Sequence, residues 1–466
     1  MGWDGIRLAA AVTAGRLAAS LSRRLRLGGG TTMPGRVARA VHPRVVSRLA
    51  AGLRRGCVVV TGTNGKTTTA RLIGHILARA GIPAAHNRAG ANLAAGIAAA
   101  LVERSGWTGR PRVDAGIFEV DEATVPLVWA PLRPRVAVLC NLFRDQLDRY
   151  GEIDLVSSRW RTALAQDPGE AVVVYNADDP LVADVGRTLP RQVPFGIADA
   201  SCGAGTLEHA ADARYCYRCG QPYQYAAVYF GHMGQYRCPR CGVRRPEPVV
   251  AARDVDLEGL RGTAFTLSTP AGERRVRTVL PGLYNVHNVL AAAAACLQLG
   301  VPLEQIAAAV EEFRPAFGRA ERVRVNGREA VLLLAKNPAG FNEVLRTVLH
   351  PQSVSGGQPV LLVAINDLTA DGRDVSWLWD TDVEMLAGRV GRVVVSGLRA
   401  YDMAVRLKYA GLPAGSLRVQ PDLAAAWEEA VAAADGPVYA LLTYTALLNL
   451  REILRRRGLV RGFWED

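Results

Sequence analysis

The segment CVVVTGTNGKTTTA at residues 57–70 constrains the fold of this chain more than any other stretch. Its β-branched residues at 58–60 predict a buried strand, and a glycine-containing loop leads from that strand into a helical pattern over residues 67–80. The backbone N–H groups of such a loop, with the N-terminus of the next helix, form an anion-binding site. The sequence therefore predicts a nucleotide-binding domain built on a strand, a loop and a helix.

Two residues at the end of this loop carry the expected phosphate chemistry. Lys66 is expected to neutralise the β- and γ-phosphates of ATP, and the Thr67 hydroxyl to bind Mg²⁺. Val60 stands where the longer phosphate-loop pattern begins with glycine, so the match is to the shorter TGTNGKTT form. A glycine-rich turn without a ligand is the alternative. The predicted nucleotide-binding residues of the loop are Gly62, Thr63, Asn64, Gly65, Lys66, Thr67 and Thr68.

Strands alternate with helices along most of the chain, which predicts an α/β fold with a mostly parallel, doubly wound sheet. Three segments follow from the pattern: a helical leader at 1–45, a central ATP-binding domain at 46–320 and a C-terminal Rossmann-like α/β domain at 321–466. Near the end of the central domain, a hairpin and an alanine-rich helix are expected. The predicted strands lie at 58–60, 115–120, 135–139, 171–175, 330–335, 359–365, 392–396 and 438–442.

Four of the eight cysteines form a pattern typical of a zinc ribbon. Cys216 and Cys219 make one C-x-x-C pair and Cys238 and Cys241 a second, and glycine or proline follows closely, as in metal-binding knuckles. We expect these four thiolates to bind Zn²⁺ in a module inserted at 202–247. Four thiolates fill all the coordination positions of a tetrahedral zinc ion and leave none for substrate or water, which favours a structural role. His232, between the pairs, is expected to be a loop residue.

The other cysteines and the charge pattern limit the functional classes. Cys57, Cys140 and Cys296 lie in apolar runs and Cys202 stands alone, which indicates a reduced, cytoplasmic protein. The net charge of +13 comes almost entirely from arginine and resembles a compositional bias, so no nucleic-acid partner is expected. The basic N-terminal helix either touches anionic lipid or packs on the next domain, and we favour packing.

The TGTNGKTTT loop is similar to the ATP loop of the Mur ligase family, which includes folylpolyglutamate synthase. These enzymes activate a carboxylate as an acyl phosphate and join it to an amine. Glu119, in the segment FEVDEA, resembles the family's Mg²⁺-binding glutamate; a solvated acid at a helix start is the alternative. Many members hold a second metal with a carbamylated lysine, but this chain has no lysine between Lys66 and Lys336.

Further segments resemble the Mur ligase motifs in the same order. CNLFRDQLDRYGE at 140–152 carries Gln146 in place of the family's histidine. In GLYNVHNVLAA at 282–292, Asn285 and Asn288 match asparagines near the adenine and phosphates; helix capping is their alternative role. GRAE at 318–321 resembles the interdomain hinge, in which Arg319 reaches ATP.

A zinc ribbon inside a Mur-like central domain resembles the MurT family, the ligase subunits of lipid II isoglutaminyl synthases. The resemblance extends from about residue 34 to the end of the chain. INDLTADGRDVSWLWD at 365–380 is similar to the MurT C-terminal signature. It contains Asp367, Asp371 and Asp374, one of which is expected to position or deprotonate the incoming ammonia. Capping aspartates in a turn are the alternative.

This resemblance implies ATP-dependent amidation of the D-glutamate carboxylate in the peptide of lipid II, with Lys66 and Glu119 supporting the chemistry. It also implies a GatD-type glutaminase subunit as partner and work at the inner face of the membrane. Two alternatives stay open. The chain could add an amino acid instead of ammonia, as folylpolyglutamate synthase does, or it could be a zinc-containing ATP-binding scaffold.

Overall fold

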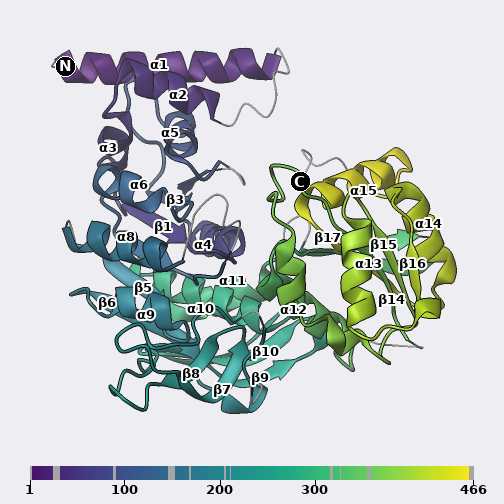
Figure 1. Ribbon diagram of the computed structural model, residues 1–466. Coiled ribbons are helices and arrows are strands. Elements are labelled where there is room, and N and C mark those ends of the chain that lie inside the picture. Colours follow the sequence, from purple (N-terminus) through teal and green to yellow (C-terminus); the bar gives the residue numbers. More distant parts are fainter. Residues whose placement is uncertain are drawn as a thin grey trace.

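The computed structural model describes residues 3–24, 32–87, 91–144, 153–166, 169–203, 206–209, 211–314, 319–325, 327–353 and 358–460. Its framework is two separate β-sheets, each covered by helices on both faces (Figure 1). A third, two-stranded sheet holds the hairpin of the cysteine module. This architecture confirms the predicted α/β fold with a second sheet domain.

The larger sheet has nine strands in the order β11-β10-β9-β6-β5-β4-β1-β3-β2. Within this order, the neighbouring strands from β9 through β6 to β2 all pair in parallel. Strand β10 pairs antiparallel with β9 and with β11, and β10 and β11 form the expected hairpin. The sheet brings the carboxyl ends of β1 and β3 side by side, which positions the site described below. Its strands are β1 Cys57–Thr61, β2 Ala84–His86, β3 Ala115–Glu119, β4 Val136–Leu139, β5 Val172–Asn176, β6 Gln192–Ile197, β9 Val250–Leu257, β10 Thr263–Thr269 and β11 Gly272–Thr278.

Alternate residues of β1 enter two different cores. Val58 and Val60 pack with the helices on one face of the sheet, and Cys57 and Val59 with those on the other. This alternation explains why an unbroken apolar run forms a strand that is buried on both sides. The first face is covered by α4 Lys66–Arg79, α10 Leu283–Gln298 and α11 Leu303–Glu312, and the second by α3 Val45–Ala50, α5 Ala94–Glu103, α6 Val125–Leu132, α8 Ile153–Gln166 and α9 Pro180–Gly186.

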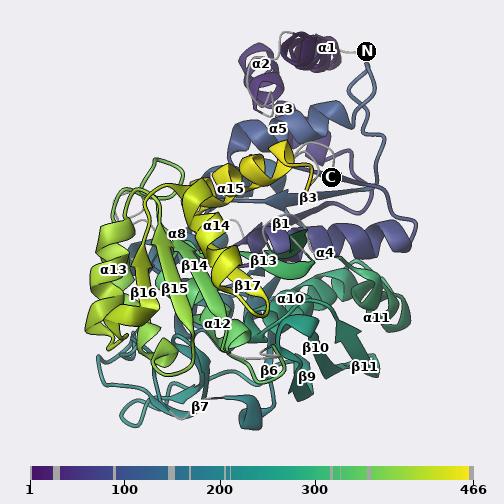
Figure 2. The same ribbon diagram turned by 90° about the vertical axis from the view of Figure 1, so that its right-hand side faces the viewer.

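The second sheet has six strands in the order β12-β13-β17-β14-β15-β16, all parallel except β12. Figure 2 shows this sheet with helices on both sides. The sequence pattern predicted four of the strands and missed β12 and the short β16. The strands are β12 Arg319–Val325, β13 Arg328–Leu334, β14 Val360–Ala364, β15 Arg392–Ser396, β16 Leu417–Val419 and β17 Val438–Leu442. The helices are α12 Pro338–Val348, α13 Ala400–Tyr409, α14 Leu423–Ala433 and α15 Tyr444–Arg456.

The N-terminal helices α1 Trp3–Arg24 and α2 Met33–Val41 pack together, and α2 rests on α5. The favoured prediction for the N-terminal segment was a helix packed on the next domain, and one face of α1 packs in this way. Among the described residues, no helix combines the length and apolar character needed to cross a bilayer. The domain limits at residues 45, 320 and 321 remain our proposal.

Candidate active site

The loop between β1 and α4 has a backbone that only glycine accommodates at two positions. Gly62 and Gly65 adopt φ angles of +133° and +85°. A Cβ atom on Gly65 would lie 2.1 Å from the side-chain oxygen of Asn288, and one on Gly62 would lie 2.8 Å from the backbone of Asn141. The loop therefore forms a close-fitting cradle at the N-terminus of α4, which fits the phosphates of a nucleotide.

Asn141, just after β4, holds this cradle in place. Its side-chain oxygen accepts a hydrogen bond from the backbone N–H of Asn64 at 2.8 Å, and its amide donates to the Asn64 carbonyl at 3.0 Å. The Thr63 hydroxyl also donates to the Phe143 carbonyl at 3.1 Å. Asn141 belongs to the segment CNLFRDQLDRYGE, but no local pattern indicated its role, because its partner Asn64 is far away along the chain.

Lys66 and three acidic residues meet at the carboxyl ends of β1 and β3. The Lys66 ammonium lies 2.5 Å from the Gly62 carbonyl oxygen and 3.1 Å from a carboxylate oxygen of Glu122. Glu119, Asp121 and Glu122 line the same cavity, as does Thr67. Carboxylate and hydroxyl oxygens are the ligands that Mg²⁺ prefers, so this donor set fits the ion. Asp121 and Glu122 were not predicted, although both belong to FEVDEA.

Helix α10 forms a further wall of this cavity. Tyr284 and Asn288 line the cavity, and the Asn288 oxygen accepts a hydrogen bond from the Thr69 hydroxyl at 3.3 Å. Asn285 contacts Asn288. Its side chain donates to the Pro281 carbonyl at 2.7 Å and accepts from the Asn288 amide at 3.0 Å. The structure thus brings Asn288 to the cavity and gives Asn285 a supporting contact. Thr68, in α4, is buried.

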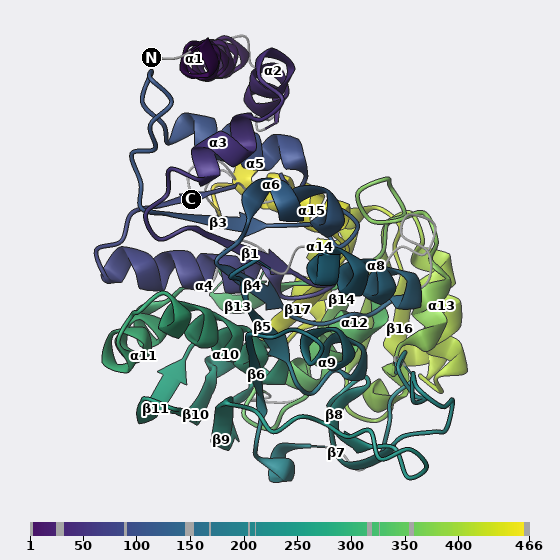
Figure 3. The same cartoon turned by 90° about the vertical axis from the view of Figure 1, so that its left-hand side faces the viewer.

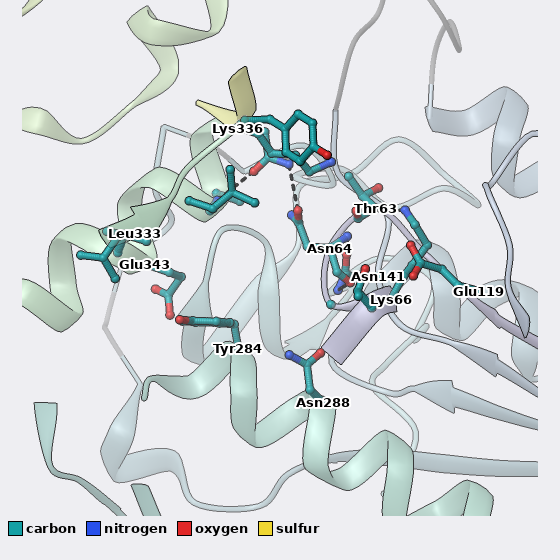
Figure 4. Close-up of a pocket in the computed structure, with 18 of the residues that line it drawn as sticks. Thr63, Asn64, Lys66, Glu119, Asn141, Tyr284, Asn288, Leu333, Lys336 and Glu343 are labelled. Atoms are coloured by element: carbon teal, nitrogen blue, oxygen red, sulfur yellow. Dashed lines mark hydrogen bonds between the residues drawn. The ribbon is translucent and has the colours of Figure 1, made fainter. Parts of the chain in front are cut away.

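The loop before α12 reaches the cradle from the second sheet. The Asn337 amide donates to the side-chain oxygen of Asn64 at 3.0 Å, while the Asn337 oxygen caps α12 by accepting from Gly340 N–H at 2.9 Å. Lys336, Ala370 and Tyr444 also line the cavity, whose volume is about 350 Å³. Figure 4 shows Lys66 and Glu119 on one side of this cavity and the Glu343 carboxylate pointing toward Tyr284 on the other.

The three C-terminal aspartates have separate partners. Asp367 forms an ion pair with Arg399 at 2.7 Å, and Asp374 accepts a hydrogen bond from Ser376 N–H at 2.8 Å, as a capping residue does. Asp371 is buried and accepts from the backbone N–H of Thr445 at 2.8 Å. None of the three is among the described residues that line the cavity, although the loop that carries Asp371 borders it through Ala370. Their catalytic roles stay predictions.

Gln146 and the side chain of Arg319 lie outside the described residues. The proposed contact of Arg319 with ATP is therefore retained only as a proposal.

The cysteine module has the geometry of a tetrahedral metal site. The sulfur atoms of Cys216, Cys219, Cys238 and Cys241 all lie within 4.8 Å of one another. Four sulfurs around one zinc ion are separated by about 3.8 Å, given a Zn–S bond of about 2.3 Å. Gly220 and Gly242, with φ angles of +71° and +76°, form the tight knuckle turns. The four residues therefore fit Zn²⁺.

Buried ion pairs anchor this module to the core of the larger sheet. Arg245, just after the second cysteine pair, contacts Asp178 at 2.5 Å, and His287 of α10 contacts the same carboxylate at 2.7 Å. Burial disfavours the charged form of Asp178, but Arg245 and His287 outweigh that effect and lower its pKa. His232 lies in the turn between β7 Gln224–Phe230 and β8 Met233–Arg237, as expected of a loop residue, but it is fully buried against Asp179.

A second ionic cluster joins the module to α12. Glu208 accepts from Gly231 N–H in the hairpin turn at 2.7 Å, and its carboxylate contacts Arg346 at 2.6 Å. Arg346 also pairs with Glu343 at 2.7 Å. Burial, together with the nearby Glu208 carboxylate, raises the pKa of Glu343 to about 7 despite Arg346. No local pattern in the sequence indicated this cluster, because its members lie on distant segments.

Comparison with known proteins identifies the family. The Mur ligase middle domain matches residues 60–215, and the MurT ligase C-terminal domain matches residues 334–447. The lipid II isoglutaminyl synthase (glutamine-hydrolyzing) subunit MurT of Staphylococcus aureus strain N315 is 32% identical over 97% of this chain and 98% of its own length. The chain belongs to the MurT family. The resemblance drawn from the sequence motifs is therefore confirmed.

Solved structures show that this MurT-family chain shares its fold with other Mur ligases. A pseudomurein peptide ligase type C from Methanothermus fervidus aligns with a TM-score of 0.66 at 22% identity, covering 86% of this chain and 78% of that one. The MurF ligase of Thermotoga maritima, solved in complex with ADP, aligns with a TM-score of 0.61 at 14% identity, covering 89% of this chain and 84% of its own. At these identities the similarity shows the fold alone.

Asn337 offers a test of how the second sheet reaches the loop of this MurT-family protein. Replacing Asn337 by serine keeps an oxygen that caps α12 but removes the amide that reaches Asn64. We expect ATP affinity, measured by calorimetry, to fall by about tenfold, the effect of one hydrogen bond, while the melting temperature stays close to that of the wild type. Unchanged ATP affinity in N337S would contradict a role for this contact.

The raised pKa of Glu343 predicts a pH dependence of stability. Its ordinary pKa is 4.5 and its folded value about 7, so as the pH rises the unfolded chain loses this proton first. The folded state is therefore progressively destabilised as the pH rises from about 4.5 to about 7. Above pH 7 the loss of folding stability amounts to about 3 kcal/mol. Glu343→Gln should remove this part of the pH dependence in denaturation curves. The exposed Glu304→Gln variant is the control, and identical profiles for wild type and E343Q would refute the prediction.

Proposed function

We propose that this chain is the ATP-dependent synthetase subunit of a lipid II isoglutaminyl synthase. In this reaction the D-glutamate carboxylate of the lipid II peptide becomes an amide. The match to the S. aureus MurT subunit over nearly the whole of both chains supports the assignment. The observation that carries it is the nucleotide cradle, in which Lys66, Thr67 and Glu119 face one cavity that is roofed by the MurT-type domain.

The proposed chemistry has two balanced steps. The substrate carboxylate attacks the γ-phosphorus of ATP, the bond to the bridging oxygen breaks, and ADP leaves an acyl phosphate. Ammonia then attacks the acyl carbon, phosphate departs, and one proton is lost. Lys66 offsets the charge on the transferring phosphoryl group, and Asn288 and Arg319 contribute to holding the nucleotide. Mg²⁺, when bound by Thr67 and Glu119, neutralises phosphate charge.

The C-terminal domain is proposed to serve the second step. Its loop over residues 365–374 follows β14, and the carboxyl end of a parallel strand is where ligands bind in such sheets. We propose that Asp371 positions the ammonia or accepts its proton, with Asp367 and Asp374 as the other candidates. Lys336 and Asn337 from the same domain help to exclude water, which would otherwise hydrolyse the acyl phosphate.

Ammonia is proposed to come from a separate, GatD-type glutaminase subunit. Glutamine hydrolysis requires a cysteine that ionises readily beside a histidine. Burial instead raises the pKa of Cys57, Cys140 and Cys202 to about 12 and also raises that of Cys296. The remaining four cysteines form the Cys₄ site, which we propose binds structural zinc. Because lipid II is membrane-bound, we further propose that the complex works at the inner face of the membrane.

A mass-spectrometric assay tests this function. The purified chain is incubated with lipid II, ATP and Mg²⁺ and supplied with either ammonium or glutamine. We expect a loss of about one mass unit per lipid II with ammonium alone, and with glutamine only when the glutaminase partner is present. Addition of an amino acid without amidation would instead favour the alternative of an amino-acid-adding ligase.

A further inference from the structure

Helix α1 has two apolar faces, only one of which is packed. Ala11, Val12 and Ala19 are buried, and Gly15 is so close to α2 that a Cβ atom would lie 3.0 Å from the Pro34 carbonyl. An α-helix turns by about 100° per residue, so the residues that oppose this face recur at predictable positions. The residues at those positions are Trp3, Ile6, Leu17 and Leu21, and all four are exposed.

Helix α1 lies at one end of the molecule. Figures 2 and 3 view α1 nearly end-on from opposite sides, and in both it lies beside α2 at the end of the molecule, beyond α3 and α5. Exposed leucines are ordinary when scattered singly, but a row of large apolar side chains along one helix indicates a binding surface. We call this row, Trp3, Ile6, Leu17 and Leu21, the α1 stripe.

The charge around the α1 stripe is strongly positive. Residues 1–48 contain nine arginines, no lysine and one acidic residue, so they carry eight of the thirteen net positive charges of the chain. Positive charge is therefore concentrated near this helix and not spread evenly, as a compositional bias alone would make it. The single acid, Asp4, pairs with Arg48 at 2.9 Å. Exposed Arg7 lies beside the stripe, and Arg36 and Arg39 are exposed on α2.

We propose that the α1 stripe docks into the headgroup region of an anionic lipid bilayer. The helix would lie parallel to the surface, with its apolar side chains toward the acyl chains and the neighbouring arginines on lipid phosphates. Trp3 suits this place because tryptophan favours the membrane interface. A second copy of the chain is the less favourable occupant, since it would bring two arginine-rich surfaces together. This inference rests on the proposed function, because the purpose of docking is access to the lipid-linked substrate.

Vesicle binding tests this surface without any turnover. The full chain is sedimented with phosphatidylcholine vesicles that contain about 30 mol % phosphatidylglycerol, and with vesicles of phosphatidylcholine alone. We compare wild type with the double variant Leu17→Glu, Leu21→Glu, whose side chains are 60% and 58% exposed. The matched control is Leu127→Glu, Leu398→Glu, which makes the same charge change at side chains 71% and 62% exposed elsewhere on the molecule.

Wild type and the control should bind the anionic vesicles, bind the neutral ones weakly, and dissociate as salt rises. The stripe variant should bind at least about tenfold more weakly at an unchanged melting temperature. Equal binding by the stripe variant would overturn the proposal. So would a wild-type dimer in solution that the stripe substitutions dissociate, in the absence of vesicle binding. Amidation measured on a soluble stem peptide tests the proposed function separately, because it does not require a bilayer.

Discussion

Replacing Lys66 by methionine is expected to reduce ATP-dependent amidation of lipid II by at least about a thousandfold, because a positioned cation on the transferring phosphoryl group stabilises the transition state directly. The Lys66 ammonium is held at the cradle by the Gly62 carbonyl and Glu122, so its position does not depend on a flexible side chain alone. The measurement is the rate of ammonium-dependent amidation by mass spectrometry, with ATP binding followed by calorimetry.

The chain offers a matched control for this substitution. Lysine occurs only at positions 66, 336 and 408, and Lys408 is exposed on α13, away from the cavity. Lys408→Met removes the same charge and should leave the amidation rate and melting temperature close to those of the wild type. If K66M kept a substantial part of the wild-type rate, the proposed phosphate chemistry at this loop would be wrong.

Loss of the Cys₄ site is expected to have the second-largest effect, and the effect should reach the active site. Cys216→Ser should abolish stoichiometric zinc, measured by elemental analysis, and lower the melting temperature by at least about 5 °C, since structural zinc contributes directly to folding. The hairpin between the cysteine pairs contacts Glu208 through Gly231, and Glu208 contacts Arg346 of α12. Because α12 also carries the Asn337 cap, amidation should fall with stability.

Cys202→Ser is the control for the cysteine change, since Cys202 lies outside the four-sulfur cluster. It should retain zinc and differ little in melting temperature. A wild-type protein purified without zinc, or a Cys216→Ser variant of wild-type stability, would show that the four cysteines are not a structural metal site.

Local sequence patterns predicted much of the framework because their causes are local. The strands at 392–396 and 438–442 have the predicted limits as β15 and β17, since each is an apolar run buried on both faces of a parallel sheet. The missed strand β16 has only three residues, and β12 is a polar, arginine-rich edge strand, so neither carries a clear apolar signal.

The candidate site was predictable only in part. Thr67, Glu119 and Asn288 line the cavity where the motifs indicated a nucleotide site. One of Asp367, Asp371 and Asp374 was expected to act on ammonia, and the three carboxylates have different partners, in Arg399, Thr445 and Ser376, so the choice among them stays a prediction. Sequence proximity within one loop does not determine the direction in which a carboxylate points.

The sequence by itself determined the elements whose function depends on neighbours along the chain. The glycines of the phosphate loop permit its backbone angles, and the two C-x-x-C pairs set the cysteine knuckles. Only the tertiary structure decided which distant residues support them. Asn141 and Asn337 reach Asn64, and Glu208 reaches Arg346, across long separations in the chain. Such contacts depend on how sheets and helices pack, and packing leaves no periodic signal in the sequence.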